Sequence, residues 1–185
     1  MPEGPECRRM ALQLSEEVTN KKLIDISVES GRYTKKPIEG MEEILQETPL
    51  NIRGTGVHGK FIFFLLDNEW TIWNTLGMTG GWSRKPAKHA RVRLVLEDGP
   101  IFYNDTRNFG TLKFVQGKQP IIDTLNSLGP DLLAEECPDD VFVNSLRRKD
   151  KKTIVEALMD QSVVSGVGNY VKAEALYLAK FRVSL

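Results

Sequence analysis

The chain has 185 residues, of which 41% are hydrophobic and 27% charged, a composition typical of a soluble globular protein with one domain or two small ones. Its longest apolar run, residues 61–66, is far shorter than the ~18 residues that span a bilayer, and acids in the first residues exclude a secretory signal. We therefore expect no membrane association and a nuclear or cytoplasmic location.

The net charge is zero, from 25 basic and 25 acidic residues, whereas nucleic-acid-binding proteins are usually basic. Basic side chains nevertheless cluster at 84–93 and 147–152. Such clusters are more often solvated surfaces than phosphate sites, so neither identifies a partner by itself. Cys7 and Cys137 form no C-x-x-C pair, and we expect two ordinary thiols with no zinc site and no disulfide.

The first helical pattern follows two prolines. Pro2 and Pro5 prevent a helix from beginning before residue 5, because proline is tolerated in the first turn of a helix and disfavoured inside it. From there apolar residues recur at helical spacing as far as Val18, and acids near the start suit the positive end of the helix dipole. The pattern predicts an amphipathic helix over residues 5–19.

The following hundred residues have the shorter period of β-structure. Alternating or continuous apolar runs occur at 23–28, 61–66, 71–76, 91–96, 101–103 and 111–115. Turn-forming residues separate the runs at Asp67-Asn68, Gly80-Gly81 and Asp98-Gly99-Pro100. Several short strands at this spacing predict a β-sandwich or barrel.

The β-pattern ends at Leu128-Gly129-Pro130. We expect a linker near 118–130, a helix that begins near Pro138, another over 152–159, and a third after the turn-rich segment 160–169. The layout is therefore α+β: an N-terminal helix and a β domain over residues 1–125, then a small helical module over 126–185.

The extreme N-terminus has a chemical interpretation. A penultimate proline commonly allows removal of the initiator Met, which would expose the secondary amine of Pro2. An α-amino group titrates near ~7.7–8.0, so a useful fraction is neutral and nucleophilic at physiological pH. Attack on a sugar C1′ would displace a base and form an iminium, with Glu3 next to it as a general acid/base. Many proteins begin with Met-Pro-Glu for no catalytic reason, so the terminus alone is weak support.

Five segments in chain order carry a resemblance. They are Met1-Pro2-Glu3-Gly4-Pro5-Glu6, Gly59-Lys60 before the 61–66 run, Leu76-Gly77-Met78-Thr79-Gly80, Asp105-Thr106-Arg107-Asn108-Phe109-Gly110, and Gly166-Val167-Gly168-Asn169-Tyr170 with Glu174-Ala175-Leu176. Together they resemble the Fpg/Nei family of DNA-repair glycosylases (formamidopyrimidine-DNA glycosylase / endonuclease VIII) over nearly the whole chain. The form of the terminus and of the two middle loops is similar to the Nei-like branch.

The resemblance implies a fold and a set of catalytic residues. The fold would be an N-terminal helix with an antiparallel β-sandwich, followed by a helix-two-turn-helix (H2TH) module. Pro2 would be the nucleophile and Glu3 the proton carrier. Glu6 would share proton work or brace the helix, and Lys60 would contact a phosphate near the lesion, although composition alone makes it a surface lysine.

The resemblance to the Fpg/Nei family also implies DNA contacts. An enzyme that acts on a base flips the nucleotide out of the stack, and something must fill the gap. Met78 and Phe109 would be the wedges and Arg107 the partner of the orphaned base; the competing interpretation, that Met78 and Phe109 are core residues, fits poorly with their neighbouring glycines. The remaining expected contacts are Asn169, which is also a good N-cap residue, His89, which is equally a surface histidine, and Asn108.

Two departures from the family pattern matter. Asn108 stands where family members often have a second Arg, and one charge fewer should lower the salt slope of DNA binding by ~1. The sequence also stops at Leu185, before the β-hairpin zinc-finger element with which family members usually continue, so we expect part of the DNA affinity to be missing.

The sequence thus predicts a monomeric bifunctional DNA glycosylase/AP lyase of base excision repair without metal or cofactor. Its substrate would be damaged DNA, either duplex or a single-stranded or bubble form, with oxidised pyrimidines as the preferred lesions. The alternatives are a damaged-DNA-binding protein without turnover, an AP lyase with little glycosylase activity, and an α+β protein unrelated to DNA, which would show no salt-dependent DNA binding.

Overall fold

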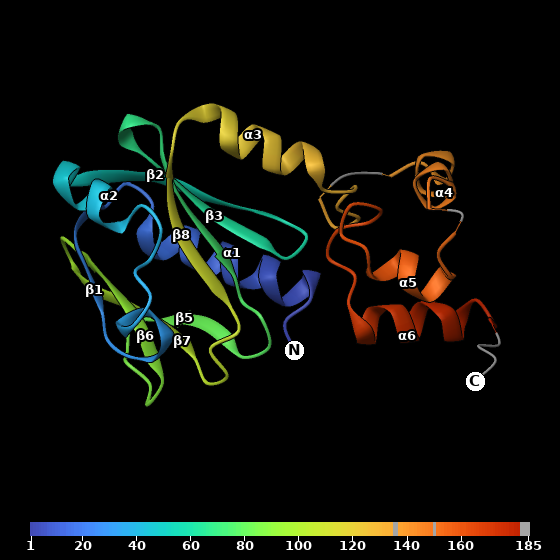
Figure 1. Ribbon diagram of the computed structural model, residues 1–185, viewed down its shortest axis with the longest axis horizontal. Coiled ribbons are helices and arrows are strands. Elements are labelled where there is room, and N and C mark those ends of the chain that lie inside the picture. Colours follow the sequence, from blue (N-terminus) through green and yellow to red (C-terminus); the bar gives the residue numbers. More distant parts are fainter. Residues whose placement is uncertain (135–136, 150, 182–185) are drawn as a thin grey trace.

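The computed structural model describes residues 1–134, 137–149 and 151–181. A β-rich domain and a smaller helical module lie side by side, and the N-terminus lies between them (Figure 1). The chain end at Leu185, to which the expectation of a missing zinc-finger element refers, is outside the described residues.

Helix α1 (Gly4–Val18) confirms the predicted N-terminal helix to within one residue at each end. Pro5 lies in its first turn, where it removes no helical hydrogen bond. The apolar positions Cys7, Ala11, Leu14 and Val18 are buried, and this face packs against strand β2.

Eight antiparallel strands make up the sheet, in the order β5-β7-β6-β1-β2-β3-β4-β8. Strands β1 and β2 pair at only two positions, Lys22 with Asn51 and Leu23 with Leu50, so the sheet folds over at this junction into two halves. The strands are β1 (Lys22–Val28), β2 (Leu50–His58), β3 (Phe61–Leu66), β4 (Trp70–Thr75), β5 (Gly80–Ser83), β6 (Ala90–Leu96), β7 (Gly99–Asp105) and β8 (Thr111–Gln116).

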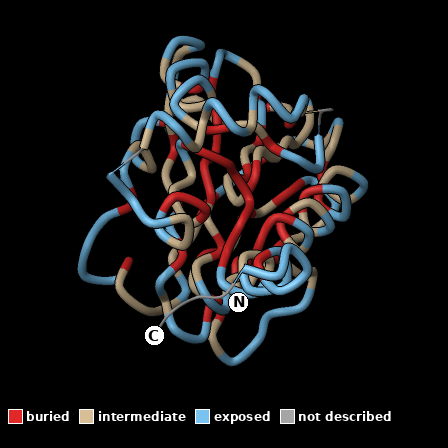
Figure 2. Tube along the Cα trace, turned by 90° about the vertical axis from the view of Figure 1, so that its right-hand side faces the viewer, coloured by how far each residue is buried: buried red, intermediate tan, exposed pale blue. Residues whose placement is uncertain are grey.

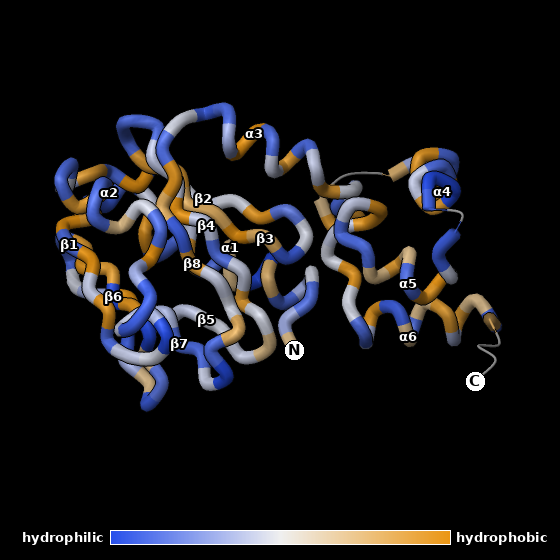
Figure 3. Tube along the Cα trace, in the orientation of Figure 1, coloured by the Kyte–Doolittle hydropathy of each residue, from blue (hydrophilic) through white to orange (hydrophobic). Residues whose placement is uncertain are grey.

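The two halves pack face to face and enclose the core. The indole Nε1 of Trp82 on β5 donates to Oδ1 of Asn74 on β4 at 3.0 Å, and the rings of Trp82 and Phe64 on β3 lie 5.5 Å apart. Buried segments run through the middle of the molecule in Figure 2, and several strands of this domain carry apolar stretches in Figure 3. The sandwich predicted from the strand spacing is therefore confirmed.

Four local expectations need correction. Residues 118–130 are not a linker throughout, because α3 (Lys118–Ser127) forms there: Pro120 falls in its first turn and Ile121 is buried. Gly80-Gly81 is the start of β5 and not a turn. The pattern also missed α2 (Met41–Glu47) and the glycine-rich strand β2. Two short 3₁₀ helices, η1 (Gly31–Thr34) and η2 (Asp67–Glu69), complete the domain.

The helical module contains α4 (Asp139–Arg147), α5 (Ile154–Met159) and α6 (Asn169–Leu178), near the predicted positions. Thr153 caps α5, because its side chain accepts the N–H of Glu156. A small second core of Leu158, Val164, Val167 and Leu176 holds the module together. In the described part of the chain, every helix is too short or too polar to span a bilayer.

Candidate active site

The N-terminal residues lie at the junction of the two domains. Pro2 is half-buried and directly precedes α1. The next residue but one, Gly4, donates its backbone N–H to the carbonyl oxygen of Gly166 in the helical module at 2.8 Å. The terminus is therefore held between the domains and not free in solvent.

The carboxylate of Glu3 is buried, with only 1% of the residue exposed. One oxygen accepts the backbone N–H of Tyr170 at 3.0 Å, and the other accepts that of Val171 at 3.2 Å. These donors belong to the first turn of α6, where N–H groups lack helical partners and the helix dipole favours negative charge. Both oxygens act as hydrogen-bond acceptors in these contacts. Glu3 thus caps a helix that begins about 165 residues further along the chain.

Glu6 braces the same region. Its carboxylate accepts the backbone N–H of Glu3 at 2.9 Å, and the Tyr170 hydroxyl donates to both of its oxygens at 3.0 and 2.9 Å. Partial burial would raise the pKa of the Glu6 carboxyl, but these hydrogen bonds outweigh it and leave the pKa below its usual value. Burial, with the charge of Glu6 next to it, raises the pKa of the Tyr170 hydroxyl to about 12.

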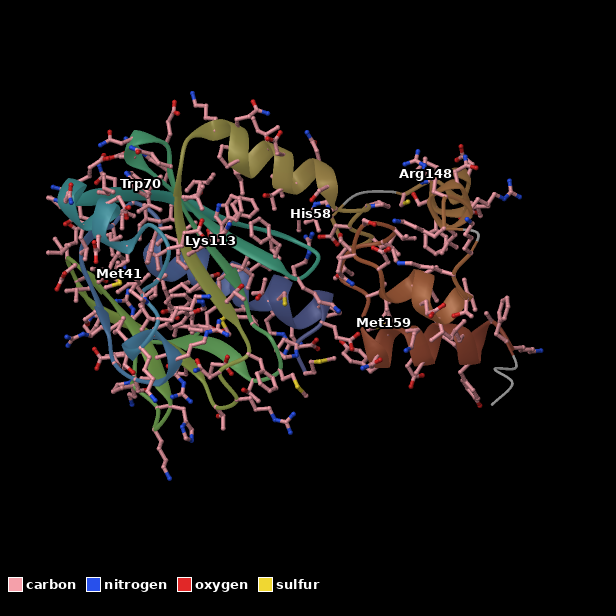
Figure 4. The ribbon with its side chains drawn as sticks, in the orientation of Figure 1. Met41, His58, Trp70, Lys113, Arg148 and Met159 are labelled. Carbon is pink, nitrogen blue, oxygen red and sulfur yellow. The ribbon has the colours of Figure 1, made fainter. Side chains whose placement is uncertain are left out.

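Lys60 lies at the turn between β2 and β3 and is half-buried. Burial lowers the pKa of its ammonium group, and the negative charge of Glu3 nearby opposes this effect. The preceding Gly59 donates its backbone N–H to Oδ2 of Asp131 at 2.9 Å. Figure 4 shows the same hairpin tip, with His58 labelled, directed toward the helical module, and His58 Nε2 lies 2.7 Å from the carbonyl oxygen of Gly129. The hairpin therefore positions Lys60 against the domain junction.

The junction depends on glycines where backbones meet. Gly166, at φ +89°, lies against Gly4 and Gly59, and a Cβ on either neighbour would come within 3.4 Å of it. A Cβ on Gly168 would be 2.2 Å from Cδ of Glu3. Larger residues here would displace the Glu3 carboxylate or separate the domains.

The Met78 and Arg107–Phe109 loops lie side by side at the end of the sandwich. Phe109 is 60% exposed and Met78 36% exposed, so the interpretation of these two as core residues is wrong. The Arg107 guanidinium donates to Sδ of Met78 at 3.1 Å. Buried Asp105 holds the loops together, since its oxygens accept Thr79 Oγ1 at 2.5 Å and the N–H of Gly110 at 2.8 Å.

Three other predicted contact residues have clear positions. Asn169 is the exposed first residue of α6, and its Oδ1 accepts a hydrogen bond from the Lys172 ammonium at 3.1 Å. Because Gly168 is the N-cap residue of this helix, the interpretation of Asn169 as the N-cap is wrong. His89 is half-buried, and its carbonyl oxygen accepts the N–H of Asp105 at 3.0 Å, which places it beside the Arg107–Phe109 loop. Asn108 adopts φ +57° within its loop.

The first basic cluster is largely committed to structural contacts. Arg84 pairs with Glu17 and Asp98, at 3.4 and 3.2 Å, and Arg93 pairs with Glu29 at 3.1 Å. Arg91 donates to the carbonyl oxygens of Asp105 and Thr106. In the second cluster Lys149 and Lys152 both contact Asp160.

Sequence reasoning missed Asp131, Arg8 and the Tyr170 side chain. Asp131 is buried, and besides Gly59 it contacts the Arg8 guanidinium at 3.5 Å. Its position directly after Leu128-Gly129-Pro130, at the end of the β-pattern, was the available signal. Cys7, adjacent to the site, is no competing nucleophile, because burial raises the pKa of its thiol to about 12.

Comparisons with known proteins agree with this geometry. The family model of the formamidopyrimidine-DNA glycosylase N-terminal domain matches residues 1–112, and that of the formamidopyrimidine-DNA glycosylase H2TH domain matches residues 128–184. The formamidopyrimidine-DNA glycosylases of Oceanobacillus iheyensis and Salinispora tropica are 35% and 32% identical over 97% of this chain. The chain covers 66% and 65% of those proteins, or about two thirds of their length.

Solved structures of Fpg and MutM are also similar to this chain. Lactococcus lactis Fpg in complex with DNA containing an abasic site has a TM-score of 0.83 at 27% identity, over 97% of this chain and 68% of that one. MutM in complex with DNA containing carbocyclic 8-oxo-G has a TM-score of 0.84 at 28% identity, over 98% and 70%. With both domain models matched in order, the chain belongs to the formamidopyrimidine-DNA glycosylase family.

Proposed function

We propose that the protein is a bifunctional DNA glycosylase/AP lyase of base excision repair that acts through Pro2. The observation that carries the proposal is the buried Glu3 carboxylate, fixed by the first turn of α6 and adjacent in sequence to Pro2. Burying a charged group is costly unless it is paired and hydrogen-bonded, and here the helix N-terminus offsets that cost. A nucleophile next to a fixed proton carrier is the arrangement that covalent catalysis requires.

The proposed reaction begins after removal of Met1. The Pro2 nitrogen attacks the sugar C1′, the C1′–N bond to the base breaks, and the base leaves with the bonding electron pair and takes up a proton from solvent. The Glu3 carboxylate accepts the proton that the Pro2 nitrogen releases and passes it to the ring oxygen, which opens the sugar and leaves an iminium at C1′. Loss of a proton from C2′ then expels the 3′-phosphate, and a second elimination expels the 5′-phosphate. Lys60 would hold a phosphate next to the reacting sugar.

The proposed partner is damaged DNA. Met78 and Phe109 would fill the gap left by the flipped nucleotide, and Arg107 would contact the orphaned base. Their exposure on loops braced by Asp105 supports this use. Asn169, His89 and Asn108 stay proposed contacts. Single-stranded or bubble DNA is a credible substrate, because the cost of flipping is lowest there. Acting on DNA, the protein would work as a monomer in the nucleus or cytoplasm.

The lesion class is the finer part of the proposal. The form of the terminus and of the wedge loops supports oxidised pyrimidines. Oxidised purines are the second candidate, because the DNA in the MutM complex carries an 8-oxo-G analogue. Excision measured side by side on an oxidised pyrimidine and on 8-oxoguanine, each in otherwise identical DNA, decides between them.

Borohydride trapping tests the catalytic proposal. The protein is incubated with DNA that holds an oxidised pyrimidine or an abasic site, then reduced with borohydride and analysed by mass. We expect an adduct on Pro2 with Met1 gone, and none with Pro2→Gly. Trapping at the abasic site alone would indicate an AP lyase with little glycosylase activity. Tight binding without any adduct would contradict the catalytic proposal and leave a damage-binding protein.

A further inference from the structure

A hollow of about 550 Å³ lies on the face of β3, β4 and β8 that points away from the sandwich core. Strand register places Phe61 beside Thr75 and Thr75 beside Thr111 on this face, while the intervening positions contribute to the core. The 36–39 segment closes the other side. The volume is within the range of small-ligand sites.

Two aromatic side chains line this hollow, the half-buried Phe61 and Trp73, of which only 8% is exposed. The ring of Phe61 lies edge-on to Trp73, with centroids 5.4 Å apart and planes at 87°. The ammonium group of Lys113, a residue of β8 that is labelled in Figure 4, is 4.3 Å from the centroid of the Trp73 ring. Aromatic faces next to cations are the arrangement with which proteins stack single-stranded bases without regard to sequence.

The charge around the hollow is mainly positive. Arg32, Lys36 and Lys113 line it, against a single lining carboxylate, Glu39, in the described part of the chain. Lys36 is exposed. The Glu39 carboxylate is 72% exposed and lies 3.9 Å from Lys113, so it neutralises the site only weakly. This charge is complementary to a phosphate.

The hollow is continuous with the proposed DNA site. At its rim the hydroxyls of Thr75 and Thr111 are 2.7 Å apart, and these residues flank the Met78 and Phe109 loops. Arg32 donates to the carbonyl oxygen of Asn108 at 3.2 Å, so one side chain both lines the hollow and anchors a wedge loop. On the other side Phe61 directly follows Lys60. A strand held by the wedge loops would therefore pass this opening.

We propose that this hollow binds one unpaired nucleotide of the DNA flanking the lesion. Its base would lie against Phe61, and its phosphate would contact Lys36 and Lys113. A paired base is not available for such stacking, so the site would favour lesions in bubbles or next to single-stranded segments. The inference rests on the proposed function for the choice of DNA as ligand.

Equilibrium binding tests the site without any catalytic step. The probe is DNA with a stable abasic-site analogue, either fully paired or flanked by unpaired nucleotides, and Kd is measured by fluorescence anisotropy. The Lys36→Gln/Lys113→Gln variant is expected to lose about tenfold in affinity for the unpaired probe and at most about threefold for the paired one. Lys35→Gln/Lys118→Gln, which removes two exposed lysines outside the hollow, is the matched control and should change both probes equally.

Photocrosslinking is a second measurement, and because it uses the wild-type protein it does not depend on whether the variants fold. With 5-iodouracil in the unpaired flank of the same probe, we expect the wild-type adduct to map to Phe61. Equal losses of affinity for the paired and the unpaired probe, together with crosslinks outside the hollow, would refute the site. Failure of the wild-type protein to bind either probe would refute it as well. A failed borohydride trap with the expected crosslink would instead refute only the catalytic function.

Discussion

The Tyr170 hydroxyl donates to both carboxylate oxygens of Glu6, at 3.0 and 2.9 Å, and so joins the first turn of α6 to the first turn of α1. The same α6 turn supplies the two N–H groups that hold Glu3. The two acids at the N-terminus are thus positioned by adjacent residues of the other domain.

Replacing Tyr170 with Phe should move the acid side of the pH–activity profile to higher pH. The hydroxyl stabilises the charged form of Glu6 and contributes to its lowered pKa, so its removal raises that pKa and protonates Glu6 at a higher pH. Single-turnover cleavage measured from about pH 4 to 8 checks this. Tyr177→Phe, on an exposed side chain of the same helix, is the control. A uniform loss of rate with an unmoved profile would show that Tyr170 is only structural.

Gly168→Ala should abolish most activity. The added Cβ would lie 2.2 Å from Cδ of Glu3, so the carboxylate must leave its place at the α6 N-terminus. Misplacement of a catalytic group by about 1 Å costs roughly a hundredfold in rate. Gly54→Ala is the matched control, because a Cβ there meets no atom within 4 Å. Comparable rates for the two variants would refute the role given to Glu3, provided that both melt at similar temperatures.

Removing both wedges should affect duplex DNA selectively. In a Met78→Ala/Phe109→Ala variant nothing fills the gap left by a flipped nucleotide, and the flipping cost of a few kcal/mol is no longer offset. We expect about a tenfold or greater loss of excision from duplex DNA and little change when the lesion lies in a bubble. Ile122→Ala, an exposed apolar side chain on α3, serves as control. An equal loss on both substrates would contradict the wedge role.

Asp160 should stabilise the helical module in a pH-dependent way. Hydrogen bonds from Lys152 and Ser162 hold its pKa well below the usual value. A depressed folded-state pKa stabilises the protein above the unfolded-state pKa, about 3.9, and this contribution is lost as the pH falls below it. Asp160→Asn should therefore cost about 1 kcal/mol at pH 7, as exposed pairs do, and progressively less toward pH 3. A constant difference in free energy of unfolding across that range would exclude the ionic explanation.

Local patterns accounted for much of the fold. The α1 helix and most strands were predictable because helical spacing, apolar alternation and turn residues are signals that act over a few positions. The exposure of Met78 and Phe109 was predictable from their neighbouring glycines. Helix α3 was missed since Gly117 and Pro120 are also typical of a linker.

Long-range partners were not predictable in this way. Arg84 was placed in a basic cluster because its carboxylate partners, Glu17 and Asp98, are remote in sequence. The same applies to Glu3, whose hydrogen-bond donors are 167 and 168 residues away. Only the tertiary structure shows which charges are neutralised and which side chains remain for a ligand.

The distance in sequence between Glu3 and its hydrogen-bond donors determines when the site can form during synthesis. During synthesis Glu3 leaves the ribosome long before Tyr170 and Val171, which lie 167 and 168 residues further along the chain. Until the module carrying α6 has folded, the Glu3 carboxylate lacks its capping donors and Gly4 lacks the Gly166 carbonyl. A nascent or partly unfolded chain would therefore carry Pro2 and Glu3 without an assembled site, so the proposed strand-breaking chemistry would be confined to the finished molecule.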